Sequence, residues 1–552
     1  MEKKKKNAIQ LHKLGTAKNT VILLSCFTVI YLVIRIYFGL LAFNFMSSGF
    51  RRAIGFLLFV WSVPLLLKLW TGRKKKEKPK PKTVWYIPFY CFIVYFAITF
   101  ALELFSSPLF FSTNYRRLIS VNDGYRFEDS VENYTTMQIP VVDRALAEKL
   151  GDKKLGNDNY GSQYHVGEYV MIDYNNNLYW IAPIEFNGFF PWANRKISPG
   201  YVLVNANDAS DVDIRFRELH YVESAYLWSD LNRTNYLAFP NFVREGDPHL
   251  ELDDGGNPKY VETVYTNRFA LVNGLDAVGV IVTDPVTGEA EFFDTADAPS
   301  WIDHIQSENV VLDQLNYWGR YVNGFMNSLF AKKDVLEVSS GINYVFSNGQ
   351  MYLQIGMTSS GSDESIVGVM MVDMRTKEAR FSRVGGATEY AASQSAKGAE
   401  QDMRFTTSDP IMINVDGVPT YFMTLKDNEG LVKRYAYVNV EDYTVVRTAQ
   451  TKTAALELYK NAIFGDKNDG EEFTVKEIRK IGEYAYIRFV RKEGSEASAN
   501  IFRVAIDVNF EIAFLEAGDR VKIKYTFENE HYIINRLIVV SKASTVAEGE
   551  TE

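Results

Sequence analysis

Cysteine is almost absent from this chain of 552 residues, which contains only Cys26 and Cys91. Both lie inside apolar segments near the N-terminus, so the rest of the chain has no thiol for a disulfide or a cysteine metal site. Domains outside eukaryotic cells commonly carry disulfides. Their absence from a domain of this size favours a bacterial envelope, in particular that of a Gram-positive cell.

Catalytic signatures are scarce as well. Residues 112–552 contain five histidines, but neither a His-Glu-x-x-His pattern nor a Gly-x-Ser-x-Gly nucleophile elbow. The segment 247–257 gathers His, Glu and Asp, yet their spacing does not fit a calcium loop, and its second half has the composition of a hairpin turn. We therefore predict no catalytic residues, no metal ligands and no cofactor.

Positive charge is concentrated in the N-terminal fifth of the chain. Residues 1–111 hold 17 Lys and Arg against 3 Asp and Glu, a net charge of +14. Because the whole chain carries −8, residues 112–552 carry −22. A body this acidic repels nucleic acid, so no nucleic-acid partner is expected.

Three long apolar segments are present near the N-terminus, at about 20–43, 53–70 and 84–105. Each is long enough, as a helix, to cross a hydrocarbon core of about 30 Å. The sequence therefore predicts a three-helix anchor over residues 20–111, with the lipid bilayer as its partner, followed by a large domain from about residue 112.

The distribution of Lys and Arg predicts the orientation of this anchor. The tail 1–19 and the connection 73–82 are both strongly basic, whereas the first connection carries only Arg51 and Arg52. By the positive-inside rule the N-terminus is cytoplasmic, and residues 112–552 are extracytoplasmic, at the plasma membrane. The alternative is that the second segment, which is short and contains Pro64, forms a re-entrant hairpin; the large domain would then be cytoplasmic.

The first and third predicted spans each contain one charged residue. Arg35 is fifteen residues into the first segment, and Glu103 lies in the outer third of the third segment. An unpaired guanidinium is costly at that depth, so we predict an intramembrane ion pair between Arg35 and Glu103. The alternative is that Arg35 reaches the outer interface by itself.

The large domain contains an internal repeat. Residues 278–292 and 367–381 align without gaps and are identical at eight of fifteen positions, including Asp284 and Asp373 at a turn. Two looser copies, at 200–205 and 434–439, have the same plan, with Asn at the turn position. Asp or Asn there accepts backbone N–H bonds and starts the turn. A tyrosine-bearing strand precedes each copy, at Tyr179, Tyr260, Tyr352 and Tyr421.

Segments with helical spacing separate the copies, at 143–150, 300–330, 387–403 and 453–464. The expected unit is a small antiparallel sheet covered on one face by a helix, and the expected fold class is a membrane-anchored α+β protein. The repeat region spans 112–465, with units near 165–240, 250–330, 340–405 and 410–465.

The strands 260–265 and 279–289, with the turn Asp284-Pro-Val-Thr-Gly-Glu289, resemble the signature of PepSY-type domains. The resemblance covers about 35 residues per copy, and the other copies depart from it. Lys377 replaces the turn glycine in the copy at 367–381, and the copies at 200–205 and 434–439 lack the Thr-Gly pair. The family implies small extracytoplasmic modules that inhibit or modulate partner enzymes such as peptidases. More broadly, the chain resembles membrane-anchored proteins of Gram-positive bacteria without an established activity.

The C-terminal part has a different pattern. Five strongly alternating segments in 471–540 predict a β-barrel of OB type. Its 11 Lys and Arg against 12 Asp and Glu favour protein interaction or capping over oligonucleotide binding. The acidic tail 541–552 is expected to be disordered.

An aromatic segment at 179–192 has six aromatic residues among fourteen, and Asn187-Gly188 is a two-residue hairpin signal. Phe186, Phe189, Phe190 and Trp192 would then crowd around a turn. Either a neighbouring element covers this tip, or it is a docking hairpin for a protein partner or a membrane interface.

These features favour a membrane-anchored extracytoplasmic binding or scaffold protein of the bacterial envelope, with a protein partner and without enzymatic activity, that regulates or assembles a partner complex. The alternative is an envelope hydrolase acting on peptide or cell-wall polymer. A deep pocket with Ser/His or paired carboxylates would favour the hydrolase, and a shallow repeat array would favour binding.

Overall fold

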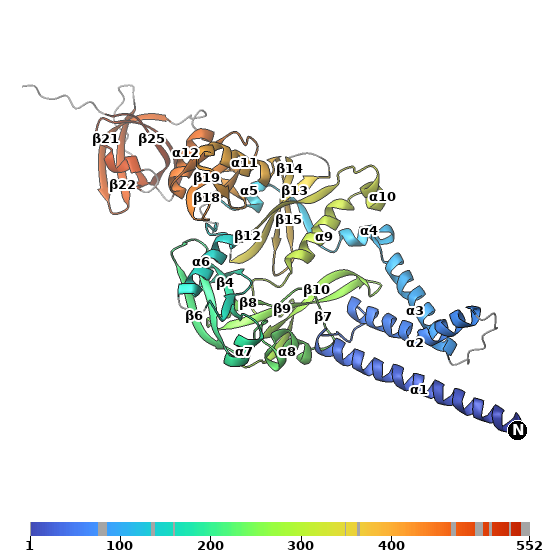
Figure 1. The fold of residues 1–552 in the computed structure, drawn as a ribbon. Coiled ribbons are helices and arrows are strands. Elements are labelled where there is room, and N and C mark those ends of the chain that lie inside the picture. The colour runs from blue at the N-terminus through green and yellow to red at the C-terminus, as the bar shows by residue number, and fades with distance from the viewer. Residues whose placement is uncertain are drawn as a thin grey trace, which may run out of the picture. The chain divides into compact units, whose positions relative to one another are not determined.

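The computed structural model describes residues 2–74, 85–133, 139–157, 161–347, 349–360, 365–464, 471–491, 501–506, 510–528 and 531–542. The chain folds as two units, Met1–Tyr459 and Lys460–Glu552. It is a mixed α+β protein with three N-terminal apolar helices and several small antiparallel sheets (Figure 1). The predicted acidic tail lies outside the described residues, apart from its first two positions.

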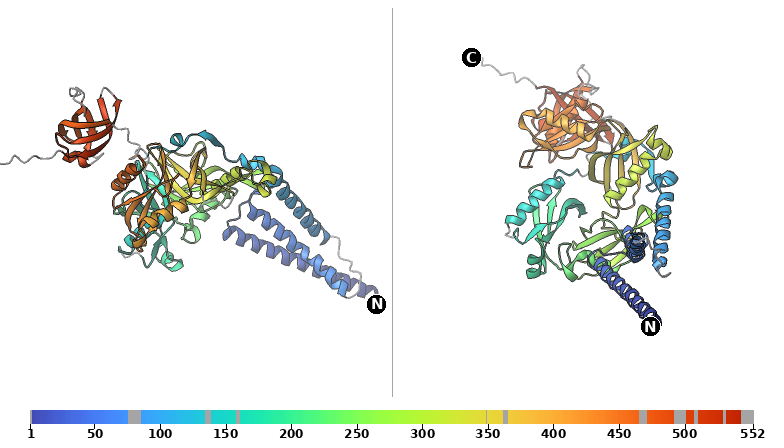
Figure 2. Two further views of the ribbon diagram at one scale, coloured as in Figure 1. Left: turned by 90° about the horizontal axis from the view of Figure 1, so that it is seen from above. Right: turned by 45° about the vertical axis from the view of Figure 1, so that its right-hand side comes forward.

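The anchor consists of α1 (Glu2–Tyr37), α2 (Ser48–Lys74) and α3 (Tyr86–Phe105). All three are long and apolar enough to cross a membrane, over Lys18–Tyr37, Ser48–Trp70 and Tyr86–Phe105. α2 is one helix that continues through Pro64, so the second segment is not a helical hairpin. Leu24, Leu65 and Trp85 form a small core among the three helices, and α1 and α2 lie side by side in the left view of Figure 2.

A short connection leads from the anchor to the first sheet. It contains α4 (Pro108–Arg116), β1 (Val121–Tyr125), α5 (Phe127–Ser130) and α6 (Arg144–Asn157). Ser106 and Ser107 end α3 and begin α4, with the proline at the first position of the new helix, where its missing N–H costs nothing.

The first two sheets each have four main antiparallel strands and one short edge strand. The first contains β2 (Tyr164–Val166), β3 (Val170–Tyr174), β4 (Asn177–Phe186), β5 (Ser198–Asn205) and β6 (Val212–Leu219), with α7 (Phe189–Arg195) between β4 and β5. The second follows η2 (Leu227–Ser229) and α8 (Leu231–Ala238), and contains β7 (Val243–Arg244), β8 (His249–Leu252), β9 (Pro258–Phe269), β10 (Asn273–Thr283) and β11 (Ala290–Asp294).

The other two sheets repeat this plan. The third follows α9 (Glu308–Arg320) and α10 (Gly324–Leu329), and contains β12 (Leu336–Ser347), β13 (Gln350–Ser359), β14 (Ser365–Asp373) and β15 (Ala379–Ala387), with β1 added in parallel to β15. The fourth follows α11 (Glu389–Ala399) and η3 (Gln401–Met403), and contains β16 (Thr406–Thr407), β17 (Ile411–Val415), β18 (Val418–Lys426), β19 (Val432–Asn439) and β20 (Val446–Ala449). α12 (Lys452–Phe464) comes next.

The predicted repeat and its turn chemistry are visible in all four sheets. Asp284 Oδ1 accepts the backbone N–H of Val286 at 2.8 Å, and Asp373 Oδ1 accepts that of Arg375 at 2.8 Å. Asn205 Oδ1 accepts the backbone N–H two residues onward at 2.9 Å, and Asn439 Oδ1 accepts the one three residues onward at 2.8 Å. Each of the four side chains therefore accepts a backbone N–H bond at the start of its turn, as the sequence predicted.

Helices cover the sheets through small apolar contacts. α6 contributes Leu146 and Ala147, and α9 contributes Val311 and Leu315, to a common core with the first and third sheets. The segment 300–330, predicted from its helical spacing, contains α9 and α10, but its first part is not helical because α9 begins only at Glu308. The preceding loop is held instead by backbone N–H bonds to a buried carboxylate described below.

The second unit contains β21 (Glu471–Ile481), β22 (Tyr484–Arg491), β23 (Phe502–Ala505), η5 (Phe510–Phe514), β24 (Arg520–Glu528) and β25 (His531–Ser541). The strands pair in the order β21-β22-β23-β25-β24, and β24 pairs back to β21. β23 and β25 run parallel, whereas the other neighbours are antiparallel. Phe473, Phe489 and Phe502 are buried at the centre.

Candidate functional site

An acidic cleft lies where the four sheets of the first unit meet. Its cavity has a volume of about 520 Å³. Each sheet contributes to the wall: Met171 lies on β3, His249 on β8, Tyr344 on β12 and Ile411 on β17. The cleft is therefore formed by the whole array of repeats and by no single sheet.

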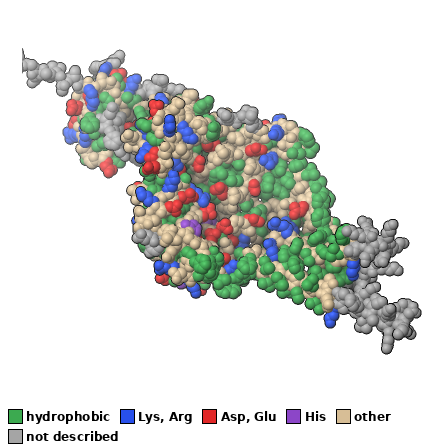
Figure 3. Space-filling model, in the orientation of Figure 1, with side chains coloured by type: hydrophobic (Ala, Val, Ile, Leu, Met, Phe, Trp, Pro, Cys, Tyr) green, Lys and Arg blue, Asp and Glu red, His purple; other side chains and the backbone are tan. Residues whose placement is uncertain are grey.

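Carboxyl groups dominate the lining of this cleft. Among the described residues, Arg144 is the one Lys or Arg in the wall, against six acidic residues: Asp143, Glu168, Glu245, Asp247, Glu308 and Asp409. Figure 3 shows Asp and Glu side chains gathered around the His side chains at the centre of the face, in the region of β8 in Figure 1. The cleft therefore attracts cationic groups.

Part of this negative charge is neutralised within the wall. Arg144 Nη2 lies 3.0 Å from Glu168 Oε1, and Lys426 forms an ion pair with Asp143. Burial, together with the nearby Asp143, raises the pKa of Asp409. Within the described part of the chain, Glu245, Asp247 and Glu308 form no ion pair with a cation, so these three residues carry the uncompensated charge of the cleft.

A histidine–carboxylate network lies directly behind this wall. Glu251 is fully buried, and its Oε1 accepts from His249 Nε2 at 2.9 Å and from the His304 backbone N–H at 3.1 Å. Its Oε2 accepts from the Asp303 backbone N–H at 2.7 Å. Asp303 Oδ2 in turn accepts from the Asp173 backbone N–H at 2.6 Å.

The protonation states in this network follow from burial and hydrogen bonding. Burial alone would raise the pKa of Glu251, but His249 and the backbone donors hold that pKa below its ordinary value. Burial and the adjacent Glu251 raise the pKa of Asp303 well above its ordinary value. Burial lowers the pKa of His304, whose Nε2 donates to the Met171 carbonyl at 2.7 Å. At neutral pH Glu251 is therefore ionised and His304 is neutral, whereas burial and the neighbouring Glu251 disfavour the charged form of Asp303.

A second group of buried carboxyls borders the cleft. Burial raises the pKa of Glu223 to about 9, and the nearby carboxyls of Glu185, Asp247 and Glu168 add to this shift. Burial also raises the pKa of Glu185, although the Ser224 backbone N–H donates to its Oε2 at 2.8 Å. Glu223 is thus uncharged at neutral pH.

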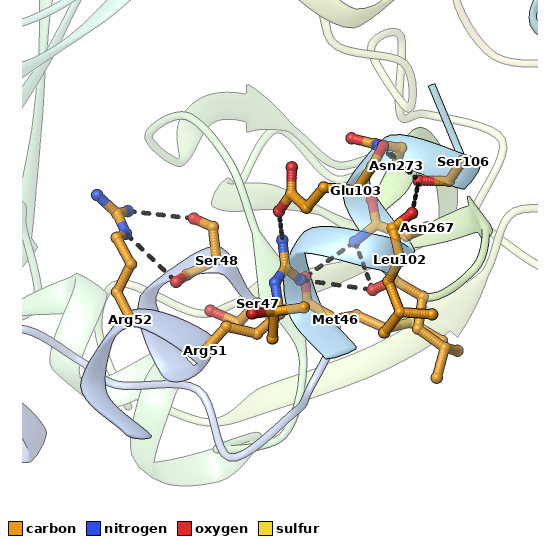
Figure 4. Close-up of polar contacts among 12 residues, drawn as sticks. Met46, Ser47, Ser48, Arg51, Arg52, Leu102, Glu103, Ser106, Asn267 and Asn273 are labelled. Atoms are coloured by element: carbon orange, nitrogen blue, oxygen red, sulfur yellow. Dashed lines mark hydrogen bonds and ion pairs between the residues drawn. The ribbon is translucent and has the colours of Figure 1, made fainter. Parts of the chain in front are cut away.

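The predicted intramembrane pair has a different cation. Glu103 Oε1 lies 3.6 Å from Arg51 Nη2, not beside Arg35 (Figure 4). The reason is the order of the helices: α2 packs against α3, and Arg51 at the start of α2 lies level with the end of α3. Arg35 lies in the last turn of α1, with its guanidinium beside Gly39.

The N-terminal end of α2 and the C-terminal end of α3 are bonded to the β9–β10 hairpin. Arg51 Nη1 donates to the carbonyls of Phe45 and Met46 at 3.0 and 2.7 Å. Asn267 Nδ2 donates to the Met46 carbonyl at 2.9 Å, and Asn273 Nδ2 donates to Ser106 Oγ at 2.8 Å (Figure 4). This junction ties the anchor directly to the second sheet.

The predicted aromatic hairpin is wrong in its backbone. Asn187 and Gly188 lie between the end of β4 and the start of α7, so the chain passes from a strand into a helix. Phe186 and Trp192 are buried in the core, whereas Phe190 is 83% exposed and Phe189 is 46% exposed. Gly188 has a φ of 91°, which suits glycine and fixes this corner. The four side chains therefore do not form one exposed tip.

The sequence prediction missed the cleft, although one signal for it was present. Glu185, Glu251 and Glu262 each stand inside an apolar strand segment and are almost completely buried. A carboxyl group in such a place must be paired, hydrogen-bonded or protonated. The segment 247–257 contains both the buried Glu251 and a hairpin turn. Asp253 accepts the turn N–H groups of Gly255 and Asn257 at 2.9 and 2.8 Å, as the turn interpretation predicted.

No protein-family model matches the chain, and no curated protein matches it.

Proposed function

We propose that the protein is a membrane-anchored extracytoplasmic binding or scaffold protein of the bacterial envelope, whose acidic cleft receives a cationic segment of a partner protein. The observation that carries this proposal is the lining of the cleft, with six carboxyl residues and one arginine among the described residues. Glu245 and Asp247 supply a negative charge that no cation among the described residues neutralises. A basic peptide segment offers the complementary charge in a shape that fits a cleft between sheets.

The domain assignments belong to the same proposal. The repeated sheets with Asp or Asn turns support a PepSY-like array that regulates or assembles a partner complex. The ring of five short strands supports an OB-like barrel in the second unit. The basic runs on the N-terminal side of α1 and after α2 support a cytoplasmic N-terminus and an extracytoplasmic body.

Binding is tested by calorimetry on the full-length protein in nanodiscs, with hexalysine as the probe. The double variant Glu245→Gln, Asp247→Asn should bind hexalysine about tenfold more weakly, equivalent to about 1.4 kcal/mol. The control Glu289→Gln, Glu291→Gln removes the same charge from exposed positions outside the cleft wall, and it should bind as the wild type does. Equal weakening in both variants, or no saturable binding, would contradict the proposal.

An envelope hydrolase acting on peptide or cell-wall polymer is the second candidate, because Glu251 and Asp303 form a carboxyl pair behind the cleft. Binding is favoured over hydrolysis because the Glu251 oxygens are occupied by backbone donors and by His249. Hydrolysis predicts that peptide or cell-wall fragments are cleaved by the wild type and not by Glu251→Gln. Retained cleavage in that variant would exclude this pair as the catalytic site.

A further inference from the structure

Large apolar side chains are exposed on the first unit next to the outer ends of the three spans. They form two patches, one beside the end of α1 and one beside the end of α3. Soluble surfaces seldom keep contiguous apolar patches without a partner. The position of these patches at the span ends indicates what that partner is.

The first patch, here called the η2 patch, consists of Phe38, Leu227 and Trp228, which are 74%, 50% and 70% exposed. The Trp228 ring lies 6.3 Å from the ring of Tyr37, the last residue of α1. Arg233 lies over the same Tyr37 ring, at 4.2 Å from its centroid. Trp228 therefore lies beside the point where α1 leaves the membrane.

The second patch, here called the α4 patch, continues from α3 without a break. Phe105 ends α3, and its ring lies 5.4 Å from that of Phe110 on α4. α10 packs against α4 and adds further exposed side chains. The exposed members of this patch are Phe105, Leu109, Phe110, Met326, Leu329 and Phe330.

Basic residues flank the α4 patch, although residues 112–552 carry a net charge of −22. Arg117 directly follows α4, and Lys332 and Lys333 follow α10; all three are exposed. Aromatic side chains with Lys and Arg beside them are the composition found at the headgroup level of a bilayer, where anionic lipids attract the cations.

We infer that both patches lie in the headgroup region of the bilayer, so that the extracytoplasmic unit rests on the membrane surface at two places. The partner is the lipid interface of the same membrane that α1, α2 and α3 cross. Because the patches are continuous with the ends of α1 and α3, no second protein is needed to cover them. The two contacts hold the first unit at a fixed tilt, which the spans alone would not define.

The test places one nitroxide label at a time on the full-length protein in phosphatidylcholine–phosphatidylglycerol nanodiscs. Cys26→Ala and Cys91→Ala provide the background, and Trp228→Cys and Phe330→Cys report on the two patches. Tyr390→Cys on α11 is the control, because Tyr390 is 62% exposed and thus comparable to Trp228 and Phe330, which are 70% and 75% exposed. α11 lies at the end of the first unit away from the spans (Figures 1 and 2).

The ratio of collisions with oxygen to collisions with a water-soluble nickel chelate should be several-fold higher at 228 and 330 than at 390, because oxygen concentrates in lipid. A ratio at both patches equal to that at 390 would show that they face water. Low collision with both reagents would show that protein covers them. Either result overturns the inference. Leu227→Cys and Met326→Cys provide replacement sites if a first variant lowers the melting temperature.

Discussion

Buried carboxyl groups determine how the region around the cleft responds to pH. Glu251 is ionised because three hydrogen-bond donors surround it, whereas Glu223 is protonated because burial and neighbouring carboxyls disfavour its charged form. The same residue type is thus used in two opposite ways. The difference lies in the number of donors within reach and not in burial, because Glu251 is the more deeply buried of the two.

Glu223→Gln should stabilise the protein at neutral and alkaline pH. The pKa of Glu223 is raised from about 4.5 to about 9, so the folded state retains a proton that the unfolded chain has lost. Stability therefore falls as the pH rises from about 4.5 to about 9, and it is not regained above that range. Glutamine cannot ionise, so the variant should gain about 1 kcal/mol or more at pH 8 and little at pH 5.

Thermal unfolding of the full-length protein in detergent, measured at both pH values, checks this prediction. Glu289→Gln is the matched control, because Glu289 is exposed and its replacement should leave the difference between pH 5 and pH 8 unchanged. A Glu223→Gln variant that parallels the wild type at every pH would show that Glu223 is ionised in the folded state.

The repeated sheets were predictable from the sequence, because each turn is specified locally. Asp284 and Asp373 bond to backbone N–H groups two residues onward, and this interaction needs no tertiary contact. The cleft was not predictable, because it depends on how four sheets pack. The prediction of a hairpin at Asn187-Gly188 failed for a related reason. This dipeptide is compatible with several turns, and the burial of Trp192 favours a helix there.

The junction between the anchor and the β9–β10 hairpin depends more on Arg51 than on Glu103. Arg51 has a side chain only 10% exposed and donates to three carbonyls, including that of Leu271 between β9 and β10, whereas the Glu103 side chain is 55% exposed. Arg51→Ala should cost about 1–3 kcal/mol because it leaves the carbonyls of Phe45 and Met46 without this donor. Glu103→Ala should cost less than about 1 kcal/mol.

The melting temperature of the detergent-solubilised protein distinguishes this junction from the pair predicted by sequence. Arg35→Ala and Glu103→Ala should have additive effects, because the two side chains share no contact. Arg51→Ala and Glu103→Ala should have less than additive effects. The reverse pattern would restore Arg35 as the partner of Glu103.

The anchor, the patches and the cleft together define how the first unit is presented at the membrane. The anchor joins the unit at separate places: the segment after α1 meets α8, where the Tyr236 hydroxyl donates to the Leu41 carbonyl at 3.0 Å, and α3 leads into α4. Attachment at separate places resists rotation of the unit better than a single tether would. In the proposed membrane-anchored arrangement, the cleft would therefore be held at one height and direction.

The orientation of the whole chain decides which compartment the cleft faces. In the cysteine-free background, Ser210→Cys lies in the exposed loop between β5 and β6, and Thr71→Cys lies near the end of α2. An impermeant maleimide applied to intact cells should label position 210, and should label position 71 only after the membrane is opened, because the basic residues after α2 favour the cytoplasm. Labelling of 71 and not 210 in intact cells would place the cleft in the cytoplasm, and the partner would then have to be sought there.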